Sequence, residues 1–256
     1  MSHDIRTPIN GIIGMLTIIR KNKDDHARVR DCLHKIELSS QLLLSLVNDV
    51  LDMAQLENGT VVLRRESMNL DEVCGSITNS VLFQAEAAGL TVTGEHDDFS
   101  GIYVRSSALH LKKILMNLFT NCVKYNKPGG SIHMQMHMLE LTDAKITCQF
   151  IIEDTGLGMS EDFIQNHLFK PFEQADESSR SSYMGTGLGM SIVQQLVEQM
   201  GGTISVESKL GEVSRFTVVL PFELDRDATA AAASTQTSSD ISGARLLVAE
   251  DNELNM

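Results

Sequence analysis

The chain has 256 residues and a formal net charge of −13, with 34 acidic residues against 21 Lys and Arg. This excess of negative charge repels a phosphate backbone and argues against nucleic acid as a partner. The apolar runs are shorter than the roughly 20 residues of a membrane span, the polar start is unlike a signal peptide, and the four scattered cysteines match no zinc or disulfide pattern. We therefore expect a cytoplasmic globular chain of roughly one to two domains.

Residues 1–58 are predicted to form a helical hairpin. Two apolar stripes with spacings of three and four residues flank a polar break at residues 21–25, and the second stripe ends at Asn58. A lone hairpin would expose much of five apolar residues of the second helix, namely Leu42, Leu44, Leu46, Leu51 and Met53. Pairing of two hairpins into a four-helix bundle would bury them, so we expect a homodimer. The alternative is that the hairpin docks on the rest of its own chain.

Residues 59–224 have a mixed pattern of helices and strands. Helices are expected over residues 69–88, 107–124 and 188–200, the second capped by Ser106 or Ser107. Strands are expected over residues 90–93, 102–105, 132–141 and 145–153, and in a final hairpin of residues 203–207 and 215–220 that stops at Pro221. Helices and strands separated in this way predict an α/β sandwich, in which helices cover one face of a mixed sheet, and hence an α+β chain. Residues 225–243, rich in Ala, Ser and Thr, are predicted to be a flexible linker.

The first candidate site lies at the start of the first helix. His3 is on the side of that helix away from the apolar stripe. Asp4 could hold one imidazole nitrogen and so raise the nucleophilicity of the other, and the Thr7 hydroxyl follows one turn later. Because an exposed histidine is usually only solvated, this interpretation depends on the neighbours of His3.

The second candidate site is a polar stripe on the otherwise apolar helix over residues 107–124. Asn117, Asn121 and Lys124 share one side of that helix. Amide oxygens at this spacing could hold Mg²⁺, and the lysine could reach a phosphate group. The alternative is a pair of asparagines that only form local hydrogen bonds.

Two glycine-rich segments complete the set. Asp154 ends a strand and could accept a hydrogen bond from an amino group such as that of adenine, while Gly156 and Gly158 allow close backbone approach to a ligand. The second segment opens a helix, where bare amides form a natural phosphate site; it comprises Gly185, Thr186, Gly187, Leu188 and Gly189. Either segment alone is weak evidence, because many tight turns look alike.

The order of these motifs over residues 1–224 resembles the phosphoacceptor and ATP-binding domains of bacterial-type sensor histidine kinases. The motifs are residues 2–10, 117–125, 154–158, 169–172 and 185–189. The resemblance implies a dimerisation and histidine-phosphotransfer hairpin over residues 1–58 and a catalytic domain of the histidine-kinase and gyrase ATPase type over residues 59–224. It also implies ATP and Mg²⁺ as cofactors, with Mg²⁺ on Asn121 assisted by Asn117, and the nucleotide among Lys124, Tyr125, Asp154, Ser214 and the glycine-rich segments.

The resemblance further implies what the chain does. ATP phosphorylates His3, with Asp4 as base, and the phosphoryl group passes to a receiver-domain aspartate in cis or in trans; Thr7 implies dephosphorylation of the receiver as a further activity. Residues 244–256 resemble the truncated start of a receiver domain, and the family implies a missing sensor region that links the whole protein to the inner membrane. The rivals are an ATP hydrolase like DNA gyrase, in which a glutamate stands where this chain has Asn117, and a dimeric scaffold that only binds nucleotide.

Overall fold

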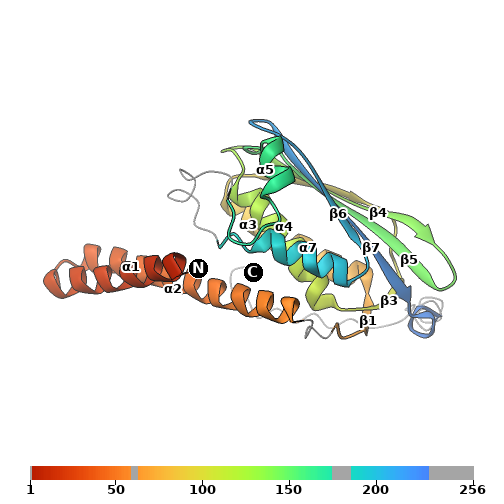
Figure 1. Cartoon of the computed structure of the whole chain (residues 1–256), viewed down its shortest axis with the longest axis horizontal. Coiled ribbons are helices and arrows are strands. Elements are labelled where there is room, and N and C mark those ends of the chain that lie inside the picture. Colours follow the sequence, from red (N-terminus) through yellow and green to blue (C-terminus); the bar gives the residue numbers. More distant parts are fainter. Residues whose placement is uncertain (1, 59–62, 175–185, 231–256) are drawn as a thin grey trace, which may run out of the picture.

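The structure, a computed structural model, describes residues 2–58, 63–174 and 186–230, without the side chains of residues 2–4 and 57. A helical hairpin is followed by an α/β unit with a helix layer and a sheet (Figure 1). The helices are α1 (Ser2–Lys21), α2 (His26–Glu57), α3 (Leu70–Ala87), α4 (Ala108–Lys124), α5 (Glu161–Asn166) and α7 (Gly189–Gln199). The strands are β1 (Glu66–Asn69), β2 (Thr91–His96), β3 (Tyr103–Ser106), β4 (Ser131–Leu141), β5 (Lys145–Asp154), β6 (Thr203–Lys209) and β7 (Val213–Leu224). Among the helices of these ranges, none has both the length and the apolar character that crossing a bilayer requires.

The predicted hairpin is confirmed. Helices α1 and α2 pack against each other, and the Asp25 side chain caps α2 by accepting a hydrogen bond from the backbone nitrogen of Arg28 at 3.0 Å. The turn between the helices lies at the end of the hairpin that is far from the α/β unit, while the start of α1 lies at the nearer end (Figure 1). The start of α1 therefore lies nearer the α/β unit than the turn of the hairpin does.

The exposure predicted for the second helix is wrong at two positions. Leu46 is 3% exposed and Met53 is 9% exposed. Met53 and Leu56 belong to the core of the α/β unit, because the last turns of α2 dock there and α2 contacts α7. The alternative of docking within the chain is thus confirmed for the end of α2, whereas Leu44 and Leu51 remain exposed.

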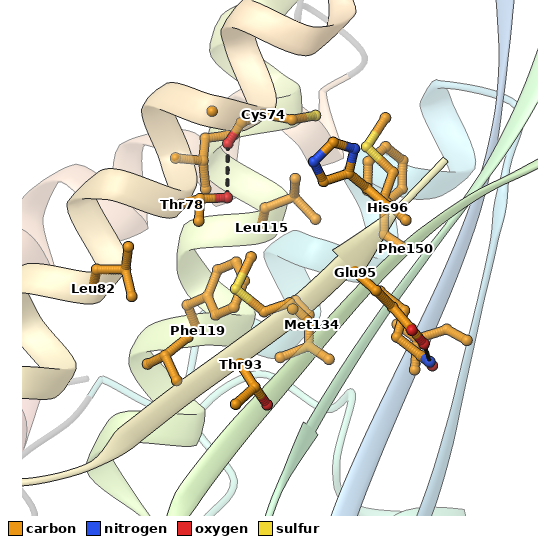
Figure 2. A pocket seen from close by; sticks show the side chains of 18 of the residues that line it. Cys74, Thr78, Leu82, Thr93, Glu95, His96, Leu115, Phe119, Met134 and Phe150 are labelled. Carbon is orange, nitrogen blue, oxygen red and sulfur yellow. Dashed lines mark hydrogen bonds between the residues drawn. The ribbon is translucent and has the colours of Figure 1, made fainter. Parts of the chain in front are cut away.

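The predicted α/β sandwich is also confirmed. The sheet has seven strands in the order β1-β3-β7-β5-β4-β2, with β6 added on β7, and its pairs are antiparallel except for β2 and β4. Helices α3, α4 and α7 cover one face (Figure 1), and Figure 2 shows side chains between α3, α4 and the sheet. Fully buried residues of α4, α7 and the strands fill this interface: Leu111, Ile114, Leu118, Leu188, Ile192, Ile132, Ile146 and Val218.

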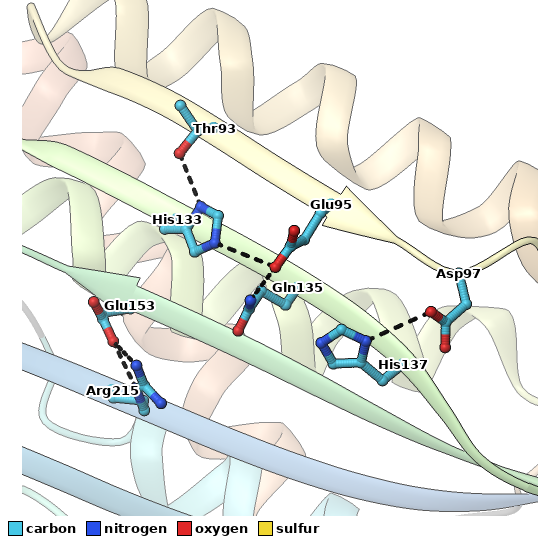
Figure 3. A network of polar contacts seen from close by, with 8 residues as sticks. All are labelled: Thr93, Glu95, Asp97, His133, Gln135, His137, Glu153 and Arg215. Carbon is cyan, nitrogen blue, oxygen red and sulfur yellow. Dashed lines mark hydrogen bonds and ion pairs between the residues drawn. The ribbon is translucent and has the colours of Figure 1, made fainter.

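The other face of the sheet is polar. Side chains on neighbouring strands lie opposite one another there in four pairs (Figure 3): Thr93 with His133, Glu95 with Gln135, Asp97 with His137, and Glu153 with Arg215. Buried residues alternate with less buried ones along β5. This two-residue period reflects one covered and one solvated face of the sheet.

Strand β7 does not stop at Pro221, contrary to the prediction. It continues to Leu224, and Pro221 pairs with Thr147 of β5. On the other edge of β7, pairing with β6 ends at Val219 and pairing with β3 begins at Glu223. Proline is tolerated because it lies in this gap between two partner strands, where a donor is not needed on that edge.

Two local expectations also differ from the structure. Ser107 is the residue before α4, but its hydroxyl lies 2.6 Å from Nδ1 of His110 and does not cap the helix. Residues 226–230, at the start of the predicted linker, are helical. They are anchored by Asp225, which forms an ion pair with Arg105 at 3.2 Å and donates its backbone N–H to the Tyr103 carbonyl.

We expect Leu118→Ala to lower the free energy of unfolding by about 2–5 kcal/mol, because Leu118 is fully buried between α4 and the sheet. Urea unfolding followed by circular dichroism measures this change. Leu109→Ala, on the same helix but at a position 72% exposed, is the matched control and should change it by less than about 0.5 kcal/mol. Equal midpoints for the two variants would contradict this placement of the core.

Candidate functional site

A cavity of about 520 Å³ lies between α4, the segment after β5, the start of α7 and the middle of α2. It brings together most residues that the sequence predicted for nucleotide binding: Asn117, Asn121, Lys124, Tyr125, Asp154, Gly158, Thr186, Gly187, Gly189 and Ser214. Gly156 and Leu188 are not in the lining but lie next to it in the chain. Pockets of this size hold small-molecule ligands in proteins.

The polar stripe of α4 forms one wall of this cavity. Asn117 donates its side-chain N–H to the Lys113 carbonyl at 3.0 Å, and its Oδ1 lies 2.9 Å from where a Cβ on Gly189 would be. The Lys124 ammonium is 2.9 Å from the Tyr125 hydroxyl and 4.6 Å from the centre of its ring. The wall therefore presents amide oxygens beside a cation.

The amide oxygens fit a hard divalent cation. In the described part of the chain, no three His, Cys, Asp or Glu side chains cluster as metal ligands. Asn117 uses its amide nitrogen on the helix backbone, which turns its oxygen toward the start of α7. Asn121 lines the cavity one helical turn further along. Oxygen ligands of this kind, completed by water and phosphate, suit Mg²⁺.

Asp154 forms the inner end of the cavity. Its side chain is nearly buried, and its Oδ1 accepts the Gly156 N–H at 2.9 Å. Burial raises the pKa of the Asp154 carboxyl above its ordinary value, and the hydrogen bond from Gly156 opposes this shift. A Cβ on Gly156 would lie 2.3 Å from the Tyr125 carbonyl oxygen, so only glycine permits this turn. Ser214 is paired with Asp154 across β5 and β7 and is also nearly buried.

The start of α7 forms the opposite wall. Gly187 has a φ of +68°, and its carbonyl accepts the Phe172 N–H at 2.9 Å. The Leu188 N–H donates to the Thr186 hydroxyl at 3.2 Å, and α7 begins at Gly189. The first amides of α7 therefore stand at the cavity, where they can donate to anionic groups together with Lys124.

The sequence analysis missed a contribution from the hairpin. Asp49 of α2 lines the cavity, and its Oδ2 accepts a hydrogen bond from the Thr186 hydroxyl at 2.8 Å. One turn later, Asp52 forms an ion pair with Lys113 of α4. Burial raises the pKa of Asp49, and the hydrogen bond from Thr186 opposes this shift. Asp49 and Thr186 are 137 residues apart in the chain, and no motif linked them.

Several predicted residues lie outside this cavity or outside the described structure. Thr7 is an exposed residue of α1 and does not line the cavity. The side chains of His3 and Asp4, the whole of Gly185, and the predicted start of a receiver domain over residues 244–256 lie outside the described residues.

Two family models match the chain. Residues 1–59 match the His Kinase A (phospho-acceptor) domain, and residues 106–224 match the "Histidine kinase-, DNA gyrase B-, and HSP90-like ATPase". Sensor histidine kinase GacS of Pseudomonas protegens is 34% identical over 254 residues, which are 99% of this chain and 27% of GacS. Sensory/regulatory protein RpfC of Xanthomonas campestris is 34% identical over 227 residues, which are 88% of this chain and 31% of RpfC. The chain thus spans less than a third of the length of these relatives.

Solved structures agree with the fold. Full-length ShkA in complex with AMPPNP matches with a TM-score of 0.63 and 26% sequence identity, over 87% of this chain and 45% of ShkA. The fold of the hairpin and the α/β unit thus occurs in a structure that was solved with a nucleotide analogue.

We expect Asp49→Asn to tighten binding of the anionic nucleotide analogue AMPPNP about threefold to tenfold. The change removes a negative charge from the cavity wall while keeping an acceptor for Thr186. Isothermal titration calorimetry measures the affinity. Asp31→Asn removes the same charge from the part of α2 where Asp31 pairs with Lys35, and this control should leave the affinity unchanged. Equal affinities for the two variants would show that the Asp49 carboxylate does not affect the nucleotide.

Proposed function

Because the chain belongs to the histidine kinase family, we propose that it is an ATP-dependent protein-histidine kinase that phosphorylates His3 and passes the phosphoryl group to a receiver-domain aspartate. The observation that carries this proposal is the convergence of Asn121, Lys124, Asp154 and the first amides of α7 on one cavity. These groups come from three separate segments of the chain, namely α4, the end of β5 and the start of α7, each with a chemistry that suits one part of ATP.

ATP binds in this cavity with its two ends on opposite walls. Asp154 accepts a hydrogen bond from the adenine amino group. Gly156 and Gly158 let the turn after β5 pack closely against the Tyr125 and Lys209 carbonyls, which shapes this end of the cavity. Lys124 and the amides of Gly187 and Gly189 hold the phosphates. Asn121, with Asn117 beside it, would hold Mg²⁺, which neutralises charge on the phosphates when it is bound.

The phosphoryl transfer needs only a positioned nucleophile and a proton acceptor. A nitrogen of the His3 imidazole attacks the γ-phosphorus in line; the N–P bond forms, the bond from that phosphorus to the bridging oxygen breaks, and ADP leaves. Asp4 accepts the proton from the imidazole. The start of α1 lies at the end of the hairpin nearer the α/β unit, which supports delivery of His3 to a neighbouring cavity.

The residue at position 117 favours transfer over hydrolysis. In ATP hydrolases of the gyrase type a glutamate at this position activates water, and an amide cannot accept that proton. Asn117 instead donates to the helix backbone. The scaffold alternative is disfavoured because the described part of the cavity brings together most of the predicted nucleotide-binding residues.

The partners we propose are a second copy of the chain and a receiver domain. Exposed apolar residues of both hairpin helices support the dimer: Ile13, Leu16, Leu33, Leu44 and Leu51. Their burial in a four-helix bundle would remove this apolar surface from water. Thr7, exposed on α1, would serve in dephosphorylation of a docked receiver. The whole protein is proposed to add a sensor region that links it to the inner membrane, leaving these domains in the cytoplasm.

We expect His3→Gln to abolish acid-labile ³²P incorporation from [γ-³²P]ATP, because glutamine offers no nucleophilic ring nitrogen. AMPPNP affinity, measured by calorimetry, should be unchanged, since His3 is on the hairpin and the nucleotide groups are in the α/β unit. His26→Gln, at the first residue of α2, is the control and should label like the unchanged chain. Labelling that persists in His3→Gln would overturn the assignment of the phosphoacceptor.

We expect Asn121→Ala to remove the part of nucleotide affinity that depends on Mg²⁺. AMPPNP titrations with Mg²⁺ and with EDTA should differ about tenfold or more for the unchanged chain and should coincide for the variant, because one oxygen ligand is lost. Leu109→Ala, at an exposed position of α4 outside the cavity, is the control and should keep the difference. Affinity that is independent of Mg²⁺ in both proteins would overturn the proposed metal site.

A further inference from the structure

A second cavity, of about 320 Å³, lies between α3, α4 and the covered face of β2, β4 and β5 (Figure 2). Helix α4 separates it from the candidate site: Leu115 and Phe119 line the second cavity, whereas Asn117 and Asn121 line the first. The two cavities share no lining residue. An occupant of the second cavity would therefore not touch a nucleotide in the first.

The wall of this cavity formed by α3 is one continuous stripe of the helix. Apart from Ile77, the α3 residues that line the cavity follow the three- and four-residue repeat of one side of a helix. They are Asp71, Cys74, Gly75, Thr78, Asn79 and Leu82. Glycine is unfavourable inside a helix, and a Cβ on Gly75 would meet nothing within 4 Å. Gly75 is itself exposed, so the space beside it is the open mouth of the cavity.

Most of the remaining lining is apolar, although Thr93, Glu95, His96 and Gln135 also contribute to it. Met134 and Phe150 from the sheet and Leu115 and Phe119 from α4 surround the space, and Figure 2 shows them together with Leu82 of α3. Such walls favour an apolar molecule through the hydrophobic effect and dispersion contacts.

Several polar groups of this cavity are already engaged within the protein. His96, for example, places its Nδ1 2.8 Å from the Asp97 carbonyl oxygen. The Thr78 hydroxyl already donates to the Cys74 carbonyl at 3.0 Å, and burial raises the pKa of the Cys74 thiol to about 12, which keeps it neutral. Two acidic residues belong to the lining. Asp71 is exposed. The Glu95 carboxylate accepts a hydrogen bond from the Gln135 side chain on the opposite face of the sheet (Figure 3). Burial of an unpaired charge against such walls is costly.

We propose that this cavity is a binding site for a compact, uncharged, apolar molecule of two to three rings or the equivalent aliphatic volume. The size follows from the volume, which is about twice that of the roughly 150 Å³ apolar cavity known to bind benzene. The charge follows from the walls, and the exposed carboxylate of Asp71 further disfavours an anion. The site stands independently of the kinase activity proposed above.

The test is a fluorescence titration of the whole chain with N-phenyl-1-naphthylamine, an uncharged three-ring probe, in the presence of saturating AMPPNP. We expect saturable binding of one probe per chain. Gly75→Leu fills the open position and should weaken this binding at least tenfold. Ser76→Leu adds the same side chain at the next position of α3, which is exposed and outside the cavity, and should leave the affinity within twofold.

Three results would overturn the site: no saturable binding by the unchanged chain, equal binding by Gly75→Leu and Ser76→Leu, or displacement of the probe by AMPPNP. Circular dichroism and the melting temperature check that each variant is folded. If Gly75→Leu does not fold, Thr78→Leu replaces it, because Thr78 lines the cavity one turn away on the same side of α3. This variant should also weaken binding of the probe at least tenfold, and a smaller effect would overturn the site.

Discussion

One side of helix α4 packs against the sheet, and its other side lines the candidate nucleotide cavity. Both sides must be satisfied by one orientation of the helix, and this constrains the whole α/β unit. Its apolar residues, including Leu111, Ile114 and Leu118, are fully buried against the sheet. The same packing holds Asn117 and Asn121 at the cavity. Rotation of α4 would expose the leucines and withdraw the amides together, so the hydrophobic effect that stabilises the core also fixes the direction of the polar stripe.

The elements most predictable from the sequence were those with a regular period and clear ends. The polar stripe of α4, the strand β5 and the end of α2 at Asn58 all follow from local patterns, and the structure has each of them. The motif residues at the cavity were predictable for a different reason. In the turn at Gly156, for example, glycine is required for a steric reason, since any Cβ at this position would collide with the Tyr125 carbonyl oxygen.

What the sequence could not predict depends on contacts between distant segments. Pro221 is a strand breaker by local rules, yet it is tolerated because pairing on one edge of β7 passes from β6 to β3 around it. Burial of Met53 depends on where the end of α2 docks, which no local pattern contains. Asp49 is likewise an ordinary polar residue of a helix until Thr186 is placed against it.

Electrostatics then determine how this cavity can hold ATP. Among the described residues that line it, Lys124 is the cation, whereas Asp49, Asp154 and Glu173 are acidic. The net charge of −13 adds no attraction for a polyanion. Affinity for the phosphates must therefore come from short-range groups, namely the first amides of α7, Lys124 and a divalent cation on the asparagine oxygens. Since the Asp49 carboxylate is supplied by α2, a movement of the hairpin away from Thr186 would also remove a negative charge from this cavity, and the proposed nucleotide affinity would then depend on the position of the hairpin.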